Sequence, residues 1–148
     1  MKISTKGRYG LRAMVDLALY SKYGYTALTS IAERQEDSEK YLEHVFSVLK
    51  KAGLVKSVKG AQGGYILACN SAVISVGDIL GVLEGKLSVI PDSEKENNAT
   101  DPMEEFLNKN VWRKIDSKIN SIANSITLDD LVMEYKKMVE TSSFIYHI

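Results

Sequence analysis

The 148-residue chain contains one cysteine, Cys69, and two prolines. A single cysteine excludes an internal disulfide framework and fits a reducing compartment, so we expect a cytoplasmic protein. No apolar run approaches the ~20 residues of a membrane-spanning helix. The N-terminal stretch MKISTKGRYG lacks the apolar core of a signal peptide. The sequence therefore predicts a soluble protein with no membrane partner.

Motifs of catalysis and cofactor binding are also missing. The sequence has no HExxH, no GxSxG, no nucleotide-binding fingerprint and no cysteine–histidine pair at a useful spacing. Its only histidines are His44 and His147. We therefore expect no enzymatic activity, no metal site and no cofactor.

The net charge of zero conceals an asymmetry along the chain. Residues 1–70 hold 11 of the 19 basic residues and 6 of the 19 acidic ones, so the remaining residues are correspondingly acidic. The N-terminal half is therefore the half that we expect to face a polyanion. This signal is modest, because many solvated protein faces are equally basic.

Residues 37–68 contain the most informative pattern, a helix followed at once by a hairpin. Ser38 is the expected N-cap and Gly53 the expected stop. Between them apolar residues recur at helical spacing, and Lys40, Glu43, His44, Ser47 and Lys51 occupy the opposite face. The hairpin that follows turns at KGAQGG, a glycine-rich tip flanked by Lys56 and Lys59. A polar-faced helix beside a basic hairpin indicates a winged helix that binds DNA.

Two helices are predicted before this stretch. The first begins after Ser4 and ends near Tyr20. Its start is rich in basic residues, namely Lys2, Lys6, Arg8 and Arg12. Such a start suits a contact with phosphate, but it could also be a solvated basic end. The second covers residues 28–35, with Ser30 or Thr29 as its cap. Together with the helix that starts after Ser38, it has the spacing of a helix-turn-helix.

The C-terminal half is predicted to be helical, with one polar loop. Helices are expected at residues 75–83, 103–126 and 127–140, with an acidic loop at 86–102 and an apolar tail at 141–148. We divide the chain into a DNA-binding domain (1–70), a connecting helix and loop (71–102) and a dimerisation part (103–148). The long helix carries a stripe of β-branched apolar residues. Such a stripe predicts a homodimer interface, although it would also suit packing within one chain. The stripe comprises Val111, Ile115, Ile119, Ile122 and Ile126.

These stretches resemble the Rrf-two family of bacterial winged-helix transcription regulators. The matching segments are MKISTKGRYGLRAM, SEKYLEHVFSVLKKAGLVKSVKGAQGGYIL and ITLDDL, so the resemblance covers nearly the whole chain. It implies a mainly α fold with a small β-hairpin wing and a long C-terminal dimerisation helix. It also implies a dimeric repressor that binds double-stranded DNA. The DNA-contacting set is then Lys2, Arg8, Tyr9, Ser38, Lys40, Tyr41, Glu43, His44, Ser47, Lys51, Lys56, Ser57, Lys59 and Gly60.

Departures from the family pattern bear on operator choice and on sensing. His44 and Lys59 replace the commoner Gln and Arg, which leaves the operator sequence open. Cluster-binding relatives carry three cysteines in the loop that here spans residues 86–102 and has none. The resemblance is therefore to the CymR-like branch, the repressors of cysteine metabolism, which implies cysteine synthase as a partner. The tail residues Tyr146, His147 and Ile148 would dock in that enzyme.

Two alternatives stay open at this point. The protein could be a redox- or iron-responsive member of the family that senses by another route, with Cys69 as a candidate. It could also be a protein-interaction module that no longer binds DNA.

Overall fold

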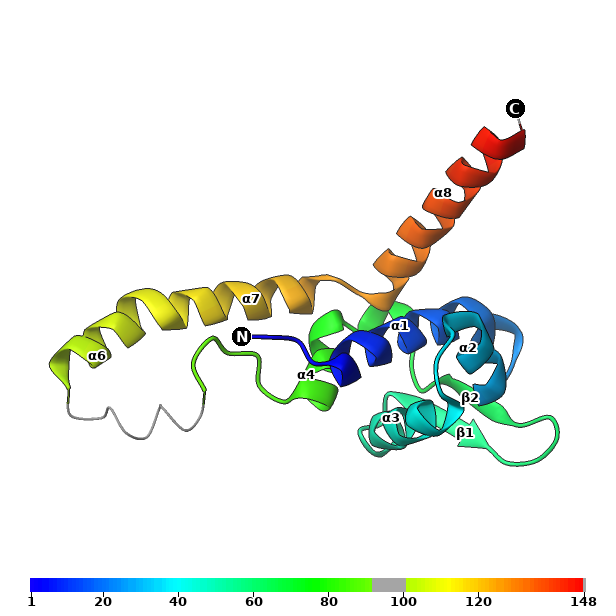
Figure 1. Cartoon of the computed structure of the whole chain (residues 1–148), viewed down its shortest axis with the longest axis horizontal. Helices are drawn as coiled ribbons and strands as arrows, with labels where there is room; N and C mark the ends of the chain where they lie inside the picture. Colours follow the sequence, from blue (N-terminus) through cyan, green and yellow to red (C-terminus); the bar gives the residue numbers. More distant parts are fainter. Residues whose placement is uncertain (92–100, 148) are drawn as a thin grey trace.

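The computed structural model describes residues 1–91 and 101–147, with the side chains of residues 143–147 excepted. We call the helices and hairpin up to Glu84 the head. The segment from Pro102 to Ser125 is the arm, and it extends away from the head as a rod (Figure 1). A last helix, α8 (Leu128–His147), leaves the head in another direction. The head consists of α1 (Thr5–Tyr20), η1 (Ser21–Tyr23), α2 (Leu28–Gln35), α3 (Glu39–Lys51), β1 (Val55–Val58), β2 (Gly64–Leu67), η2 (Ser71–Val73) and α4 (Val76–Glu84). This mainly helical architecture with one hairpin confirms the predicted fold class.

The head is built around one apolar cluster to which α1, α2, α3 and α4 all contribute. Phe46 is its largest fully buried side chain, and Met14, Leu17 and Ile31 are also fully buried. The start of α1 follows from Ser4, whose hydroxyl accepts a hydrogen bond from the Gly7 amide at 3.3 Å. The local signals of the sequence are thus the ones that shape the head.

The predicted cap of α2 is wrong. Ala27 is the residue at the N-cap, and no side chain hydrogen-bonds there. The helix starts at Leu28, two residues earlier than a Thr29 cap would allow, and the Thr26 backbone just before it is paired with Tyr65 in an isolated bridge. The end of α2 is well formed, since Glu36 adopts the left-handed conformation at φ 53° that turns the chain toward α3.

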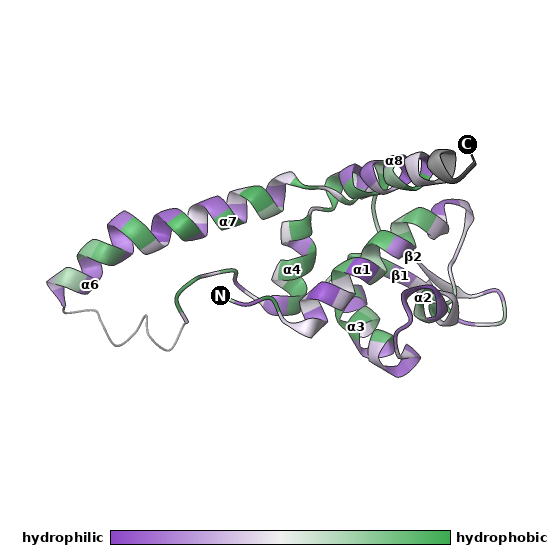
Figure 2. Cartoon of the chain, turned by 45° about the horizontal axis from the view of Figure 1, so that its top comes forward, coloured by the Kyte–Doolittle hydropathy of each residue, from purple (hydrophilic) through white to green (hydrophobic). Residues whose placement is uncertain are grey.

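The arm is nearly the single long helix that the periodicity predicts. It comprises α6 (Pro102–Leu107), a π-helical turn η3 (Asn108–Trp112) and α7 (Arg113–Ser125). Within it the Asn110 side chain donates to the Phe106 carbonyl at 2.8 Å. Hydrophobic and hydrophilic residues alternate along the whole arm (Figure 2).

The predicted isoleucine stripe divides into two faces. Ile119 and Ile126 pack against a second apolar cluster, which α4 and α7 form with Leu87. Ile115 and Ile122 instead remain exposed, by 39% and 62%. Packing within the chain therefore accounts for two of the five predicted interface residues, because α4 lies against that side of α7.

The start of the predicted acidic loop is held against the arm. The Asp116 carboxylate accepts from the Ser88 hydroxyl at 2.6 Å and from the Val89 amide at 2.7 Å. The Asn120 side chain donates to the Leu87 carbonyl at 3.0 Å. Residues 92–100 of this loop lie outside the described part of the chain.

The boundary between α8 and the tail is also corrected. The helix begins as predicted, with reciprocal hydrogen bonds between Thr127 and Asp130. It does not end near Glu140 but continues to His147. Ile148 and the side chains of Tyr146 and His147, which belong to the predicted docking tail, lie outside the described residues. None of the described helices has both the length and the apolar character that a membrane crossing needs.

Candidate nucleic-acid interface

The outer face of α3 is polar and exposed, as a recognition helix requires. Leu42, Val45, Phe46 and Leu49 are fully buried on its inner face. Ser38 starts the helix, because its hydroxyl accepts from the Tyr41 amide at 3.3 Å. The predicted base- and phosphate-contacting residues on the outer face are all exposed, namely Lys40, Glu43, His44, Ser47 and Lys51.

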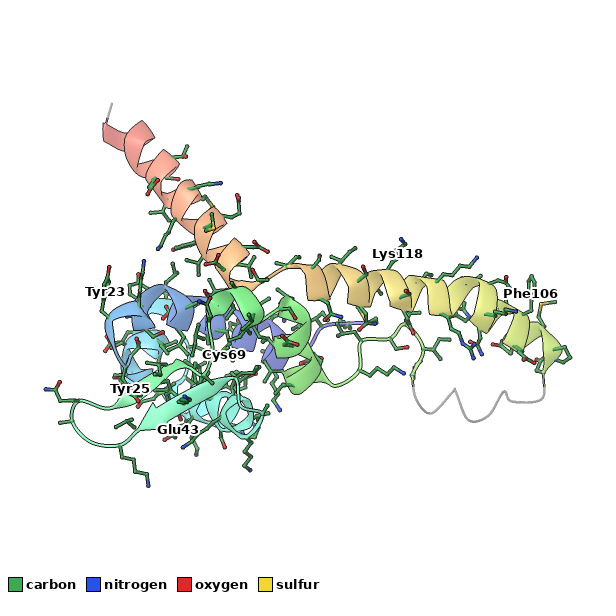
Figure 3. The ribbon with its side chains drawn as sticks, turned by 180° about the vertical axis from the view of Figure 1, so that it is seen from behind. Tyr23, Tyr25, Glu43, Cys69, Phe106 and Lys118 are labelled. Carbon is green, nitrogen blue, oxygen red and sulfur yellow. The ribbon has the colours of Figure 1, made fainter. Side chains whose placement is uncertain are left out.

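The hairpin stands beside this face, on the side of the molecule that carries Glu43 (Figure 3). Its strands pair in antiparallel register from Val55 opposite Leu67 to Val58 opposite Gly64. Lys56, Lys59 and Gly60 are exposed and Ser57 is half-buried. The tip depends on Gly63, where a Cβ atom would lie 2.1 Å from the Val58 carbonyl oxygen.

The hairpin is fixed to α3 and to the chain before α2. The Tyr65 ring packs on the Phe46 ring with centroids 4.8 Å apart. The Tyr65 backbone exchanges two 2.8 Å hydrogen bonds with Thr26, which form an isolated bridge beside the two-stranded hairpin. Burial raises the pKa of the Tyr65 phenol, and the negative charge of Glu43 raises it further. The hairpin is therefore packed directly on α3.

Aromatic residues connect α1 with the start of α3. The Tyr9 ring meets the Tyr41 ring edge-on, with centroids 6.5 Å apart. The Arg12 guanidinium lies 5.3 Å from the centre of the Tyr9 ring. Burial raises the pKa of Tyr41, and the carboxylates of Asp37 and Glu84 add to the effect. This places Tyr9 and Tyr41 together at the edge of the α3 face.

The N-terminus of α1 already holds a carboxylate. Glu84, the last residue of α4, accepts from the Ser4 amide at 3.0 Å and from the Ser4 hydroxyl. The contact is possible because position 7 is glycine, where a Cβ would lie 2.2 Å from the Glu84 carboxylate oxygen. A phosphate at this end would have to meet Lys2 rather than the helix terminus itself.

Arg8 lies on α1, next to Tyr9 in the chain. It lines a groove with Leu11, Leu131 and Tyr135, between α1 and α8. Of the predicted DNA-contacting residues, the structure thus brings together those of α3 and the hairpin with Tyr9. Arg8 instead lines the groove between α1 and α8.

Sequence reasoning missed the residues that hold the helix-turn-helix together. Asp16 is 1% exposed and accepts from Arg34 at 2.7 Å and from the Gln35 side chain at 2.7 Å. Its hydrogen bonds raise the pKa of Arg34, whose guanidinium also stacks 3.8 Å from the centre of the Tyr20 ring. The available signal was a single acidic residue within the apolar stripe of the first helix.

The described residues contain no group of three or more His, Cys, Asp or Glu side chains that could hold a metal ion. Cys69 is a free, exposed thiol. A helix-turn-helix whose second helix presents a polar face beside a basic hairpin defines a winged-helix DNA-binding protein.

The comparisons with known proteins agree with this class. Residues 3–134 match the Rrf2 family model, described as an iron-dependent transcriptional regulator. The chain is 44% identical over 131 residues to the HTH-type transcriptional regulator CymR of Bacillus subtilis, covering 88% of this chain and 89% of that protein. It is 40% identical over 136 residues to the regulator IscR of Vibrio cholerae, covering 90% and 76%.

Solved structures give the same relationship. The structure of CymR, described as the global cysteine regulator of B. subtilis, superposes with a TM-score of 0.75 at 42% identity, covering 90% of this chain and 98% of that one. IscR of T. potens superposes with a TM-score of 0.72 at 46% identity, covering 93% and 90%. The chain belongs to the Rrf2 family of DNA-binding transcriptional regulators.

Proposed function

We propose that this protein is a homodimeric repressor that reads its operator with α3 in the major groove and the hairpin in the adjacent minor groove. The observation that carries the proposal is the exposed polar face of α3 beside the hairpin lysines, joined through the Phe46–Tyr65 contact. Glu43 and His44, both exposed on α3, would meet base edges. The exposed lysines Lys40, Lys51 and Lys56 would meet phosphates, and Lys59 would enter the minor groove.

The dimer would form through the arm. Ile115 and Ile122 are exposed on one face of α7, with half-buried Val111 one turn before them. A two-fold dimer would cover this face and present two recognition helices to two half-sites. Residues 1–70 would then act as the DNA-binding domain and residues 103–148 as the dimerisation part.

Band-shift titrations at two salt concentrations test the DNA-binding mode. Affinity should fall steeply with salt, because phosphate contacts release counterions. Glu43→Ala should relax base preference, whereas Lys56→Ala should weaken all sequences alike. Glu33→Ala, an exposed change on α2, is the matched control. Binding without salt dependence, or no enrichment of any sequence from random oligonucleotides, would point to an interaction module instead.

Cysteine-metabolism genes are the proposed targets, and cysteine synthase is the proposed partner. The support is the similarity to CymR, together with the absence of cysteine from residues 86–102. Co-elution of the full chain with cysteine synthase is the expected result, and removal of Tyr146, His147 and Ile148 should abolish it. No co-elution of the full chain would refute the partner, while co-elution of the truncated chain would refute only the tail as the docking element.

A further inference from the structure

A groove of about 480 Å³ lies where α8 leaves the head. The end of α1, the end of β2, residues 69–71 and the first turns of α8 line it, and Cys69 marks its place in Figure 3. It shares no lining residue with the groove that contains Arg8. Small-molecule sites typically have volumes of roughly 300–1,000 Å³, so this groove has room for a small ligand.

Contacts within the chain hold the walls of this groove in place. The Ser71 hydroxyl donates to the Asp129 carboxylate at 3.4 Å, which joins η2 to α8. The Leu128 amide donates to the Ile74 carbonyl at 2.9 Å, and the Leu128 side chain is fully buried. The groove is therefore formed before a ligand arrives, which lowers the cost of binding.

Two lysines from different helices line the groove, Lys22 at the end of α1 and Lys136 of α8. Both are exposed, and neither forms an ion pair with any residue that the structure describes. Among the described residues that line the groove, Asp129 is the only acidic one. Two lysines and one aspartate give the lining a formal charge of +1. A complementary ligand carries one more negative charge than positive charges.

The rest of the lining is largely apolar. Ala18 and Leu67 are half-buried, and Val132 exposes 9% of its surface. These side chains suit a short hydrocarbon chain between the charged groups of the ligand. An acidic α-amino acid combines two carboxylates, one ammonium group and such a chain.

We propose that this groove binds an acidic α-amino acid, with its two carboxylates at Lys22 and Lys136 and its ammonium group at Asp129. All the residues involved belong to one chain, so the site depends neither on the dimer nor on the DNA contacts proposed above. Ile66 and Leu67 of β2 line the same groove. The ligand would therefore lie against the strand that returns from the tip of the hairpin.

The single cysteine gives a direct measure of occupancy, because Cys69 is exposed and lines the groove. N-ethylmaleimide, an uncharged reagent, should alkylate Cys69 of the full chain about tenfold more slowly when L-glutamate is present at about ten times its dissociation constant. Titration calorimetry gives that constant. L-Glutamine lacks one carboxylate and glutarate lacks the ammonium group, so each should bind at least about tenfold more weakly than L-glutamate.

Variants test the assigned contacts. Lys22→Gln/Lys136→Gln should raise the dissociation constant of L-glutamate at least about tenfold. Lys114→Gln/Lys118→Gln removes two exposed lysines of α7 outside the groove and should leave the constant unchanged. Asp129→Asn retains an acceptor for the Ser71 hydroxyl but loses the charge, so it should abolish the preference for L-glutamate over glutarate. Circular dichroism should show wild-type helix content in every variant.

Four results would overturn the proposal. The first is the absence of both binding heat and protection of Cys69 with L-glutamate up to about 10 mM. The second is equally tight binding of L-glutamine. The third is an unchanged affinity in Lys22→Gln/Lys136→Gln. The fourth is binding that leaves the alkylation rate of Cys69 unaltered, which would place the ligand outside this groove.

Discussion

In the head, Ile31, Ile74 and Ile79 expose at most 1% of their surface, whereas Ile115 and Ile122 of the arm expose 39% and 62%. Isoleucine side chains are therefore buried in the head and exposed in the arm. The head buries its apolar face against its own helices, while the arm leaves one face uncovered. Head stability should thus be independent of protein concentration, whereas burial of the arm should depend on it.

The α8 helix resembles the arm in this respect. Met133, Met138 and Val139 expose between 45% and 59% of their surface, although Leu128 at its start is fully buried. The transition from buried to exposed occurs where α8 leaves the head (Figure 1). Exposed apolar residues in both segments indicate a contact surface rather than a core.

Matched phenylalanine truncations should give the largest contrast between the two regions. Phe46→Ala removes a fully buried ring and should lower the free energy of unfolding by about 3–5 kcal/mol. Phe106→Ala, which truncates a ring 59% exposed, should change the stability of the monomer by no more than about 0.5 kcal/mol. Urea unfolding at low protein concentration measures both values.

The contrast between head and arm would be refuted if the two substitutions lowered the free energy of unfolding by similar amounts. A large cost for Phe106→Ala in dilute monomer would mean that the tip of the arm packs on its own chain.

Aspartate substitutions in the arm should separate association from folding. Ile115→Asp combined with Ile122→Asp places charges at the centre of the proposed interface and should raise the dimer dissociation constant at least about a hundredfold, or about 2.7 kcal/mol. The helical circular dichroism of the head should persist. Ser121→Asp, an exposed change on the same helix, is the control. Sedimentation equilibrium with an unchanged dimer would contradict the assignment.

The elements that could be predicted from sequence are those whose signals are local. Ser4 and Ser38 cap α1 and α3 as expected, and the helix expected at residues 75–83 is α4, which starts with a capping box formed by Ser75 and Asp78. The hairpin follows from alternation and its glycine tip. Each of these signals lies within a few residues of the feature that it specifies, so no tertiary information was needed.

The remaining features depend on residues far apart in the chain. Glu84 reaches Ser4 across 80 positions, and Asp16 reaches Arg34 across 18. An acidic residue within the apolar stripe of α1 marks Asp16, but the sequence around neither contact identifies the partner. The burial of Ile119 likewise depends on which neighbour covers that face of α7. The spacing of apolar residues cannot distinguish α4 of the same chain from α7 of a second copy.

The smallest expected effect is a dependence of head stability on alkaline pH. The pKa of Tyr65 and that of Tyr41 are raised, mainly by burial, so the folded head favours the neutral phenol. The unfolded chain then loses these protons first, at a pKa of about 10, and stability falls as pH rises from there through the folded pKa values. Tyr65→Phe should flatten this decline, whereas Tyr23→Phe, at a side chain 95% exposed, should leave it unchanged. Urea unfolding between about pH 9 and 11 measures the slopes, and an equal decline in all three proteins would show that the phenol at position 65 is as free to ionise in the head as in water.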